Sequence, residues 1–237
     1  MASQTEPLTH IGEEQELDFW KGFVHTDRFI KNWVEAAPNP ELDIEVDLLI
    51  RGLGAFRTSD DRVRILDVGS GPVSHFSNGF DKEHFELHAA DPLADHYNAL
   101  WDHPRKNDVC IPVACAGEQL SQKFDADYFD LVHIRNAIDH TINPIDVIRE
   151  AAKITKPNGF VMVHGWENEA DHQNYRGMHQ WNMRLLNSVG DLLFLDKDQT
   201  AYSVADQLGD TVAFARVWNK AKPERRRVWS GVLLRVL

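Results

Sequence analysis

Two acidic residues and two glycines form the pattern in this sequence that points most directly to chemistry. Asp67 stands two residues before Gly69, Gly71 follows, and Asp91 comes 22 residues after Gly69. Because glycine has no Cβ atom, a backbone built from it can approach a bound molecule closely. A carboxylate at the end of a strand, as expected for Asp91, can accept hydrogen bonds from both hydroxyls of a ribose. Asp67 would repel a neighbouring pyrophosphate and attract a cation.

These residues favour a ligand that has a cationic centre and a ribose but no phosphate, a description that S-adenosylmethionine fits. A dinucleotide fingerprint would require a third glycine at position 74, where the sequence has Ser74. Two simpler interpretations stay open. Asp67 could accept hydrogen bonds from the backbone N–H groups of the turn that follows it, and Asp91 could be an ordinary residue before Pro92.

Short apolar runs that alternate with helical patterns predict the elements that position these residues. A helix with proline at its start is expected over Pro144–Thr155. Five buried strands are expected over Val63–Gly69, Glu86–Asp91, Val109–Cys115, Tyr128–Arg135 and Phe160–Trp166. This order indicates a parallel sheet covered on both faces, and ligands of such sheets collect beyond the carboxyl ends of the strands.

The two ends of the chain follow different patterns. Apolar spacing predicts a helix over Glu14–Ala37, which Pro38 and Pro40 would end, and a second helix over Glu41–Leu53. Strands over 211–218 and 227–237 are expected to form an antiparallel hairpin at an edge of the sheet. The stretch 180–204 fits neither pattern. We therefore expect an N-terminal helical cap segment over residues 1–60 and a ligand-binding domain over residues 61–237.

Five segments together resemble a class I S-adenosylmethionine-dependent methyltransferase of the small-molecule type. They are ILDVGSGP, HAADPL, ACAGEQL, YFDLVHIRNAIDHTINP and VIREAAKITKPNGFVMVHGWEN, and they span about half of the chain. The resemblance implies an α/β, three-layer, Rossmann-like fold with a mainly parallel seven-stranded sheet and a C-terminal antiparallel hairpin. The later run GWENEADHQNYRGMHQWN is similar to members that act in bacterial glycan and natural-product pathways.

The same resemblance implies how the cofactor S-adenosylmethionine is bound. Its methionine part would lie near Asp67, Gly69, Ser70 and Gly71. Its ribose would bind Asp91, with Pro92 beside the adenine. Ala116, Gly117 and Glu118 match the loop that holds the adenine edge, although many members have an acidic residue in place of Ala116. The residues beside the sulfonium would be Arg135 and Asn136.

Titratable side chains gather where the acceptor of the methyl group would lie. Asp139 and His140 follow the fourth strand, and His164, Glu167 and Glu169 come at the end of the fifth strand, with His172 and His179 in the next loop. A hydroxyl or a protonated amine must lose a proton during methyl transfer, so a general base is useful. His140 is the preferred base, and Asp139, His164 and Glu167 are further catalytic candidates. Packing against the cofactor is the simpler role for His140.

A metal site and an aromatic acceptor wall are weaker interpretations of the same region. Asp139, His140 and Glu167 could bind magnesium, but their spacing is not diagnostic, so no metal ligand is assigned. Trp166, Trp181 and Tyr175 could line the acceptor or simply pack in the core. The N-terminal aromatic residues Trp20, Phe23 and Trp33 likewise could cover the ligands or pack on the sheet.

Composition limits the classes of partner. The formal net charge of −12 argues against nucleic acid, since binders of nucleic acid need a basic face. The basic cluster 219–227 is expected to be a solvated hairpin connection rather than a contact for an anionic substrate. Cys110 and Cys115 are expected to be free thiols. No apolar run is long enough to cross a membrane, and the polar N-terminus resembles no signal peptide, so a cytoplasmic protein is expected.

The function that the sequence favours is methyl transfer from S-adenosylmethionine to a hydroxyl of a small-molecule or glycan-precursor acceptor. Two alternatives stay open, an NAD-linked oxidoreductase and a non-catalytic binding protein with the same fold. The oligomeric state does not follow from the sequence.

Overall fold

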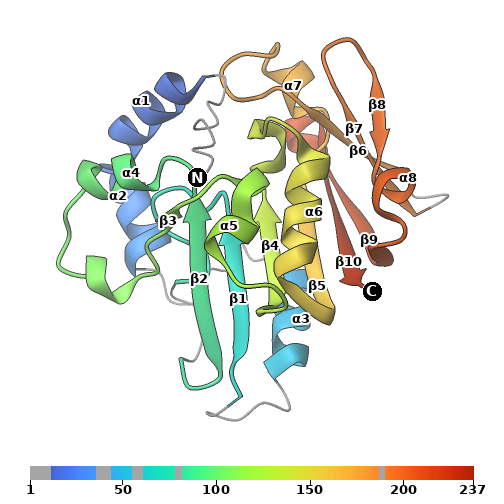
Figure 1. Cartoon of the computed structure of the whole chain (residues 1–237). Helices are drawn as coiled ribbons and strands as arrows, with labels where there is room; N and C mark the ends of the chain where they lie inside the picture. The colour runs from blue at the N-terminus through green and yellow to red at the C-terminus, as the bar shows by residue number, and fades with distance from the viewer. Residues whose placement is uncertain (1–11, 36–43, 55–60, 78–81, 187–189) are drawn as a thin grey trace, which may run out of the picture.

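The computed structural model describes residues 12–35, 44–54, 61–77, 82–186 and 190–237, and it is built around a seven-stranded sheet. The strand order is β3-β2-β1-β4-β5-β10-β9 (Figure 1). Neighbouring strands from β3 to β5 are parallel, whereas β10 is antiparallel to both β5 and β9. The strands are β1 (Val63–Val68), β2 (Phe85–Asp91), β3 (Val113–Ala114), β4 (Phe129–Arg135), β5 (Thr155–Trp166), β9 (Val212–Lys222) and β10 (Arg227–Val236). The expected fold class, including the C-terminal hairpin, is confirmed.

Helices lie on both faces and above the carboxyl ends of the parallel strands (Figure 1). The longer ones are α1 (Glu13–Phe23), α3 (Ile44–Gly54), α4 (Ala94–Leu100) and α6 (Pro144–Ile154), and the shorter α-helices are α2 (Asp27–Phe29), α5 (Leu120–Lys123), α7 (Glu169–His172) and α8 (Val204–Leu208). The remaining helical turns are η1 (Ile30–Glu35, a π-helix) and the 3₁₀ turns η2 (Lys106–Asp108), η3 (Gly117–Gln119), η4 (Ile138–His140) and η5 (Pro223–Arg225). None of the helices in the described ranges is long and apolar enough to span a membrane.

Local sequence explains why α6 begins and ends almost where it was expected. The Asn143 side chain accepts a hydrogen bond from the backbone N–H of Ile145 at 3.0 Å, and Pro144 occupies the first helical position. An asparagine cap followed by proline is a strong helix start. The apolar residues of α6 then face the sheet.

The long N-terminal helix expected over Glu14–Ala37 is interrupted. α1 ends at Phe23, and the Thr26 hydroxyl accepts a hydrogen bond from the N–H of Phe29 at 3.2 Å, which starts a new helix. A threonine cap of this kind ends one helix and begins another although the apolar spacing continues. The last residues of the expected helix, both prolines, residues 41–43 of the second expected helix and residues 55–60 lie outside the described residues. The division at residue 60 stays a prediction.

Two other segments differ from expectation. The stretch that fitted no pattern contains a small antiparallel sheet of β6 (Asn182–Leu186), β7 (Asp191–Leu195) and β8 (Ala201–Ser203). The strand expected over Val109–Cys115 is only two residues long. Pro112 lacks a backbone N–H, and the N–H of Cys110 donates to the Ser77 hydroxyl at 2.9 Å instead of to a neighbouring strand. Cys110 and Cys115 are free thiols, and burial raises the pKa of Cys110 to about 12 and that of Cys115 to about 11.

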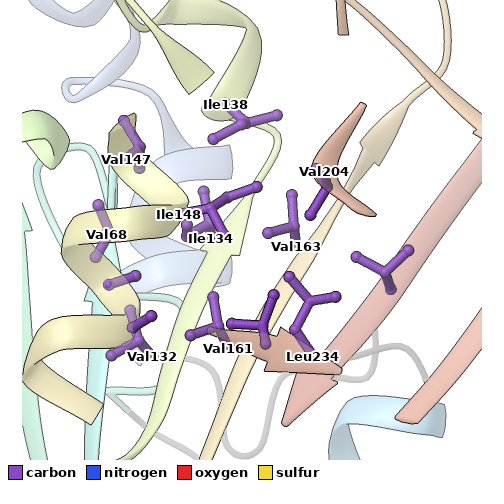
Figure 2. Close-up of a cluster of buried hydrophobic side chains, with 14 of the residues drawn as sticks. Val68, Val132, Ile134, Ile138, Val147, Ile148, Val161, Val163, Val204 and Leu234 are labelled. Carbon is purple, nitrogen blue, oxygen red and sulfur yellow. The ribbon is translucent and has the colours of Figure 1, made fainter. Parts of the chain in front are cut away.

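Alternating side chains of the central strands build a separate core on each face of the sheet. Val132, Ile134, Val161 and Val163 point to the face that α6 covers, as Figure 2 shows. Leu131 and Met162 point to the opposite face, against residues of α3. A third cluster joins the first helices to the region of α4. Because alternate residues face opposite ways, a polar residue that faces α3 from inside a strand points away from the face that α6 covers.

Candidate functional site

A cavity of about 470 Å³ opens beyond the carboxyl ends of β1, β2 and β4. α1 and the α7 region lie above this edge of the sheet in Figure 1. The cavity is within the size range of small-molecule sites. Ten of the sequence-derived candidates line it, and they are Gly69, Ser70, Gly71, Asp91, Pro92, Gly117, Glu118, Arg135, Asn136 and His140. The residues that the sequence singled out from separate segments therefore meet around one cavity.

The turn after β1 requires both of its glycines. Gly69 and Gly71 have φ values of +66° and +65°, a region that side-chain-bearing residues rarely adopt. A Cβ atom on Gly69 would lie 2.4 Å from the Cβ of Ala137, and one on Gly71 would lie 2.8 Å from the Trp20 ring. The absence of side chains at both glycines lets the turn pack closely against Ala137 and Trp20 and leaves the adjoining cavity open.

Asp91 is buried at the end of β2 and already holds the walls of the cavity together. One carboxylate oxygen accepts from the N–H of Gly71 at 3.0 Å, and the other accepts from the N–H of Leu93 at 2.9 Å. Each oxygen has further lone-pair capacity. The carboxylate is thus fixed in place and can still accept hydrogen bonds from a diol.

The loop after β3 contributes Gly117 and Glu118 to the cavity, whereas Ala116 lies outside its lining. The Glu118 carboxylate accepts from the N–H groups of Ile142 and Asn143 at 2.7 and 3.2 Å. These bonds tie the loop to the residues just before α6. Glu118 therefore supports the backbone as well as facing the ligand space.

Arg135 and Asn136 mark the end of β4. The Arg135 guanidinium lies 5.3 Å from the centre of the Trp229 ring and hydrogen bonds His75 at 3.3 Å. Burial, followed by the charge of Arg135, lowers the pKa of His75 to about 3. Asn136 has a φ of +51°, and its N–H donates to the His164 carbonyl at 2.8 Å. This bend turns the chain from the strand into the cavity wall.

Asp67 and His164, two of the expected site residues, lie inside the molecule and do not line the cavity. Asp67 pairs with His133 at 2.9 Å and accepts from the Ser74 hydroxyl at 2.6 Å, while His133 is 2.7 Å from His164. Burial alone would raise the pKa of Asp67, but the hydrogen bonds from His133 and Ser74 outweigh it and the pKa is lowered. Asp67, His133 and His164 all point to the face of the sheet that α3 covers, because they alternate along their strands with the residues that face α6. The expectation that they touch the ligands is corrected.

A cluster of Asp139, His140 and His179 also borders the cavity. His179 Nδ1 lies 2.7 Å from Asp139 Oδ2 and 3.0 Å from His140 Nε2, and the last pair, His140 Nε2 and Asp139 Oδ2, is 3.5 Å apart. Asp139 is buried, whereas both rings line the cavity. The sequence pointed to the first two residues. The sequence did not connect His179 to them, because it is one of many polar residues in its loop and no spacing motif links residues 39 apart.

Glu167 lies outside the cavity lining, away from this cluster. Its carboxylate accepts from the Ser230 hydroxyl and the N–H of Leu185, so that it joins β5 to β10 and β6. The magnesium set of Asp139, His140 and Glu167 considered from the sequence is therefore corrected, because Glu167 is engaged elsewhere.

Arg227 differs from exposed members of the basic cluster because it is partly buried and lines the cavity. It forms an ion pair with buried Glu169 and lies 4.5 Å from the centre of the Trp166 ring, and all three residues line the cavity. Burial lowers the pKa of Arg227 from its usual value. The exposed members, such as Lys220 and Arg226, fit the expected solvated connection.

Aromatic residues from the N-terminal helices cover the cavity, as the sequence had allowed. Trp20 and Trp33 line it, and Trp20 also contacts Tyr97 of α4 edge-on at 5.8 Å between ring centres. Of the expected acceptor wall, Trp166 lines the cavity, whereas Trp181 and Tyr175 do not.

The charges around the cavity are mainly negative. Two guanidiniums line it, those of Arg135 and Arg227. Four carboxylates line it, those of Glu16, Asp91, Glu118 and Glu169. An excess of negative charge in a partly enclosed site favours a cation over a pyrophosphate.

The family comparison agrees with this geometry. The model of a family described as a methyltransferase domain matches residues 25–199, well over half of the chain. Among curated proteins, none matches this sequence significantly.

Solved structures with the same fold include three small-molecule or cofactor-dependent enzymes. An S-adenosylmethionine-dependent methyltransferase from Aquifex aeolicus has a TM-score of 0.54 at 16% identity, covering 93% of this chain and 98% of that chain. The N-methyltransferase NodS from Bradyrhizobium japonicum, solved with S-adenosylhomocysteine, has a TM-score of 0.51 at 12% identity over 94% and 97% of the two chains. The 1,6-didemethyltoxoflavin-N1-methyltransferase from Burkholderia thailandensis, solved with its substrate and S-adenosylhomocysteine, has a TM-score of 0.50 at 14% identity over 100% and 97%.

Proposed function

Because the chain belongs to the family of S-adenosylmethionine-dependent methyltransferase domains, we propose that it transfers the methyl group to a hydroxyl of a small-molecule acceptor, with glycan precursors as one such class. The observation that carries this proposal is a single cavity that joins the Asp91 carboxylate and glycine turn at one end to the His140 cluster at the other. Donor and acceptor would meet inside it, beside the end of β4.

The cofactor is assigned to the end of the cavity that holds Asp91. The Asp91 carboxylate would accept the ribose hydroxyls, and its position, fixed by two backbone N–H groups, means that little ordering is needed on binding. The excess of carboxylates would favour the sulfonium. The other contacts would come from Gly69, Ser70 and Gly71 on the methionine part, from Pro92, Gly117 and Glu118 around the adenine, and from Arg135 and Asn136 beside the sulfonium.

Methyl transfer forms an oxygen–carbon bond while the carbon–sulfur bond breaks, and the electron pair of that bond stays on sulfur. The positive charge would pass from sulfur to the acceptor oxygen, so that oxygen must release its proton. His140 is the side chain that we expect to act on the acceptor oxygen, since its ring lines the cavity and contacts Asp139 and His179. Enclosure by α1 would keep competing water away from the reacting atoms.

Two measurements test the proposal. Calorimetry should give micromolar binding of S-adenosylhomocysteine and little binding of NAD. Cell extract incubated with the protein and S-adenosylmethionine labelled in the methyl group should then yield a labelled small molecule whose methyl group is on oxygen. Tighter binding of NAD would instead support an oxidoreductase. Cofactor binding without turnover of any acceptor would support a non-catalytic binding protein, and a methyl group on nitrogen or carbon would contradict the hydroxyl assignment.

A further inference from the structure

Three potential metal ligands converge at the acceptor end of the cavity. Asp139 and His140 belong to η4, and His179 reaches them from the loop after α7. That loop is fixed in place, because the N–H of Gln180 donates to the Asp139 carbonyl at 2.9 Å. The three ligand atoms are Asp139 Oδ2, His140 Nε2 and His179 Nδ1, and they lie 2.7, 3.0 and 3.5 Å apart.

Hydrogen bonds alone do not satisfy this arrangement. If His179 Nδ1 carries a proton and donates it to Asp139, His140 Nε2 faces either that same N–H group or the carboxylate. A second proton, on His140, would then place two N–H groups against each other at 3.0 Å. Neutral rings thus leave at least one of the three contacts without a good donor–acceptor pair. A cation between the three atoms would be attracted by all of their lone pairs at once.

Two of the three separations, 3.0 and 3.5 Å, match those between ligands of one metal ion, and the 2.7 Å contact between His179 and Asp139 would have to lengthen slightly. For bonds of about 2.1 Å, two ligands at right angles are about 3.0 Å apart, and two at the tetrahedral angle are about 3.4 Å apart. Three protein ligands on one side leave the remaining positions open, as in catalytic sites. Here the open side is the cavity, because both histidine rings line it. Two imidazoles and one carboxylate suit zinc, iron(II), cobalt or nickel better than magnesium or calcium.

We propose that Asp139, His140 and His179 bind one divalent transition-metal ion at the acceptor end of the cavity. Buried Asp139 supplies the negative charge that offsets the ion, and Arg227, whose guanidinium also lines the cavity, is already paired with Glu169. The binding of the ion does not depend on the proposed function, but its role does. An acceptor hydroxyl bound to the ion would have a lowered pKa, would lose its proton to water and would attack the methyl carbon as an alkoxide. His140 would then act as a ligand of the ion rather than as a base.

The test uses the full chain after dialysis against a chelator and measures binding of the metal alone. Titration with Co²⁺, followed by visible absorption, and calorimetry with Zn²⁺ should each give one ion per chain. His179→Ala should weaken binding at least about 100-fold, since it removes a direct ligand and loss of a mere supporting partner already costs 10–100-fold. Asp139→Asn should weaken it similarly and keeps the size of the buried side chain.

His172→Ala is the matched control, because His172 is an exposed histidine of α7 outside the main cavity and its loss should leave the metal affinity unchanged. Absence of stoichiometric binding, or equal affinities for the parent, His179→Ala and His172→Ala proteins, would overturn the proposal. Binding of S-adenosylhomocysteine is measured on the same samples. If the cofactor binds and the metal does not, the metal site fails while the proposed function stands. If the metal binds and the cofactor does not, the metal site stands while the proposed function fails.

Discussion

The Asp91 carboxylate has a structural role and, in the function that we propose, a binding role as well. Its two oxygens hold the N–H groups of Gly71 and Leu93, and the same oxygens face the cavity. Charge-assisted hydrogen bonds are worth roughly 1.5–3 kcal/mol each. Asp91→Ala should therefore weaken S-adenosylhomocysteine binding by at least about tenfold, which corresponds to about 1.4 kcal/mol. Calorimetry measures this change.

Asp91→Asn separates the two roles of that residue. The amide keeps the shape of the side chain but loses the charge and has only one acceptor oxygen. Affinity should fall in this variant too, while the melting temperature stays closer to that of the parent than in Asp91→Ala. Unchanged affinity in a folded Asp91→Ala protein would reject the ribose assignment.

His140 is the residue whose removal should affect turnover most selectively. Once an acceptor is known, His140→Ala should lower kcat by about 10²–10⁴, the usual range for a group that assists proton transfer. Affinity for S-adenosylhomocysteine should change little, because His140 lies in the cluster opposite Asp91. Steady-state kinetics and calorimetry on one preparation measure both. Normal turnover in the variant, or a loss of cofactor affinity equal to the loss of rate, would show that His140 only packs there.

At the scale of elements, α1 covers the part of the cavity that we assign to the cofactor. Trp20 packs over Gly71 and against Tyr97, and its indole N–H donates to Glu16 at 2.7 Å. Trp20→Ala should weaken cofactor binding by about five- to thirty-fold, as expected for the loss of about 1–2 kcal/mol of aromatic contact. Calorimetry on Trp20→Ala and on Lys21→Ala, an exposed neighbour as control, tests this. Equal affinities in the two variants would mean that α1 does not cover the ligand.

The same scale shows which parts of the fold are readable from the sequence. Short apolar runs predict the buried strands, and the asparagine cap and proline predict the helix Pro144–Ile154. The small sheet β6-β7-β8 does not show this pattern, because only β7 contains such an apolar run, and β6 and β8 mix polar and apolar residues. Its pairing depends on neighbours that only the folded chain supplies. The interruption after Phe23 depends on a single threonine cap, which apolar spacing does not register.

For the site, Gly69 and Asp91 at the ends of strands line the cavity as expected, whereas Asp67 and His164, which lie inside strands, do not. Gly69 and Asp91 stand where the strand order brings loops together, so their place follows from topology. Asp67 and His164 point to the opposite face because of the register between strands. His179 reaches its partners through a long loop, and no local pattern encodes such a contact.

At the scale of the whole molecule, His75 links stability to pH. Its pKa is about 3 in the folded protein, against an ordinary value of 6.5. Between these two pH values His75 is protonated in the unfolded chain and neutral in the native state. The free energy of unfolding should therefore fall as the pH decreases from 6.5 towards 3, by up to about 1.4 kcal/mol per pH unit from this group. Asp67, whose pKa is lowered, adds a loss at more acidic pH, below its ordinary value of 3.8.

His75→Gln should flatten this pH dependence by about one proton, because glutamine does not titrate. Urea unfolding of the ligand-free protein at pH values from 7 to 4 gives the slopes for the parent and the variant. The remaining histidines contribute equally to both proteins and cancel in the difference. Identical slopes would show that His75 is not held neutral by its surroundings.

The position of β10 in the sheet has a consequence for the order in which the protein can be completed during synthesis. β10 follows all the other strands along the chain, yet it lies between β5 and β9 and provides Arg227 at its first residue. Domains generally fold as units. The strands β1 to β5 are made before β10, and β9 pairs with no described strand other than β10. The part of the cavity that Arg227 lines should thus form only after β10 has been synthesised.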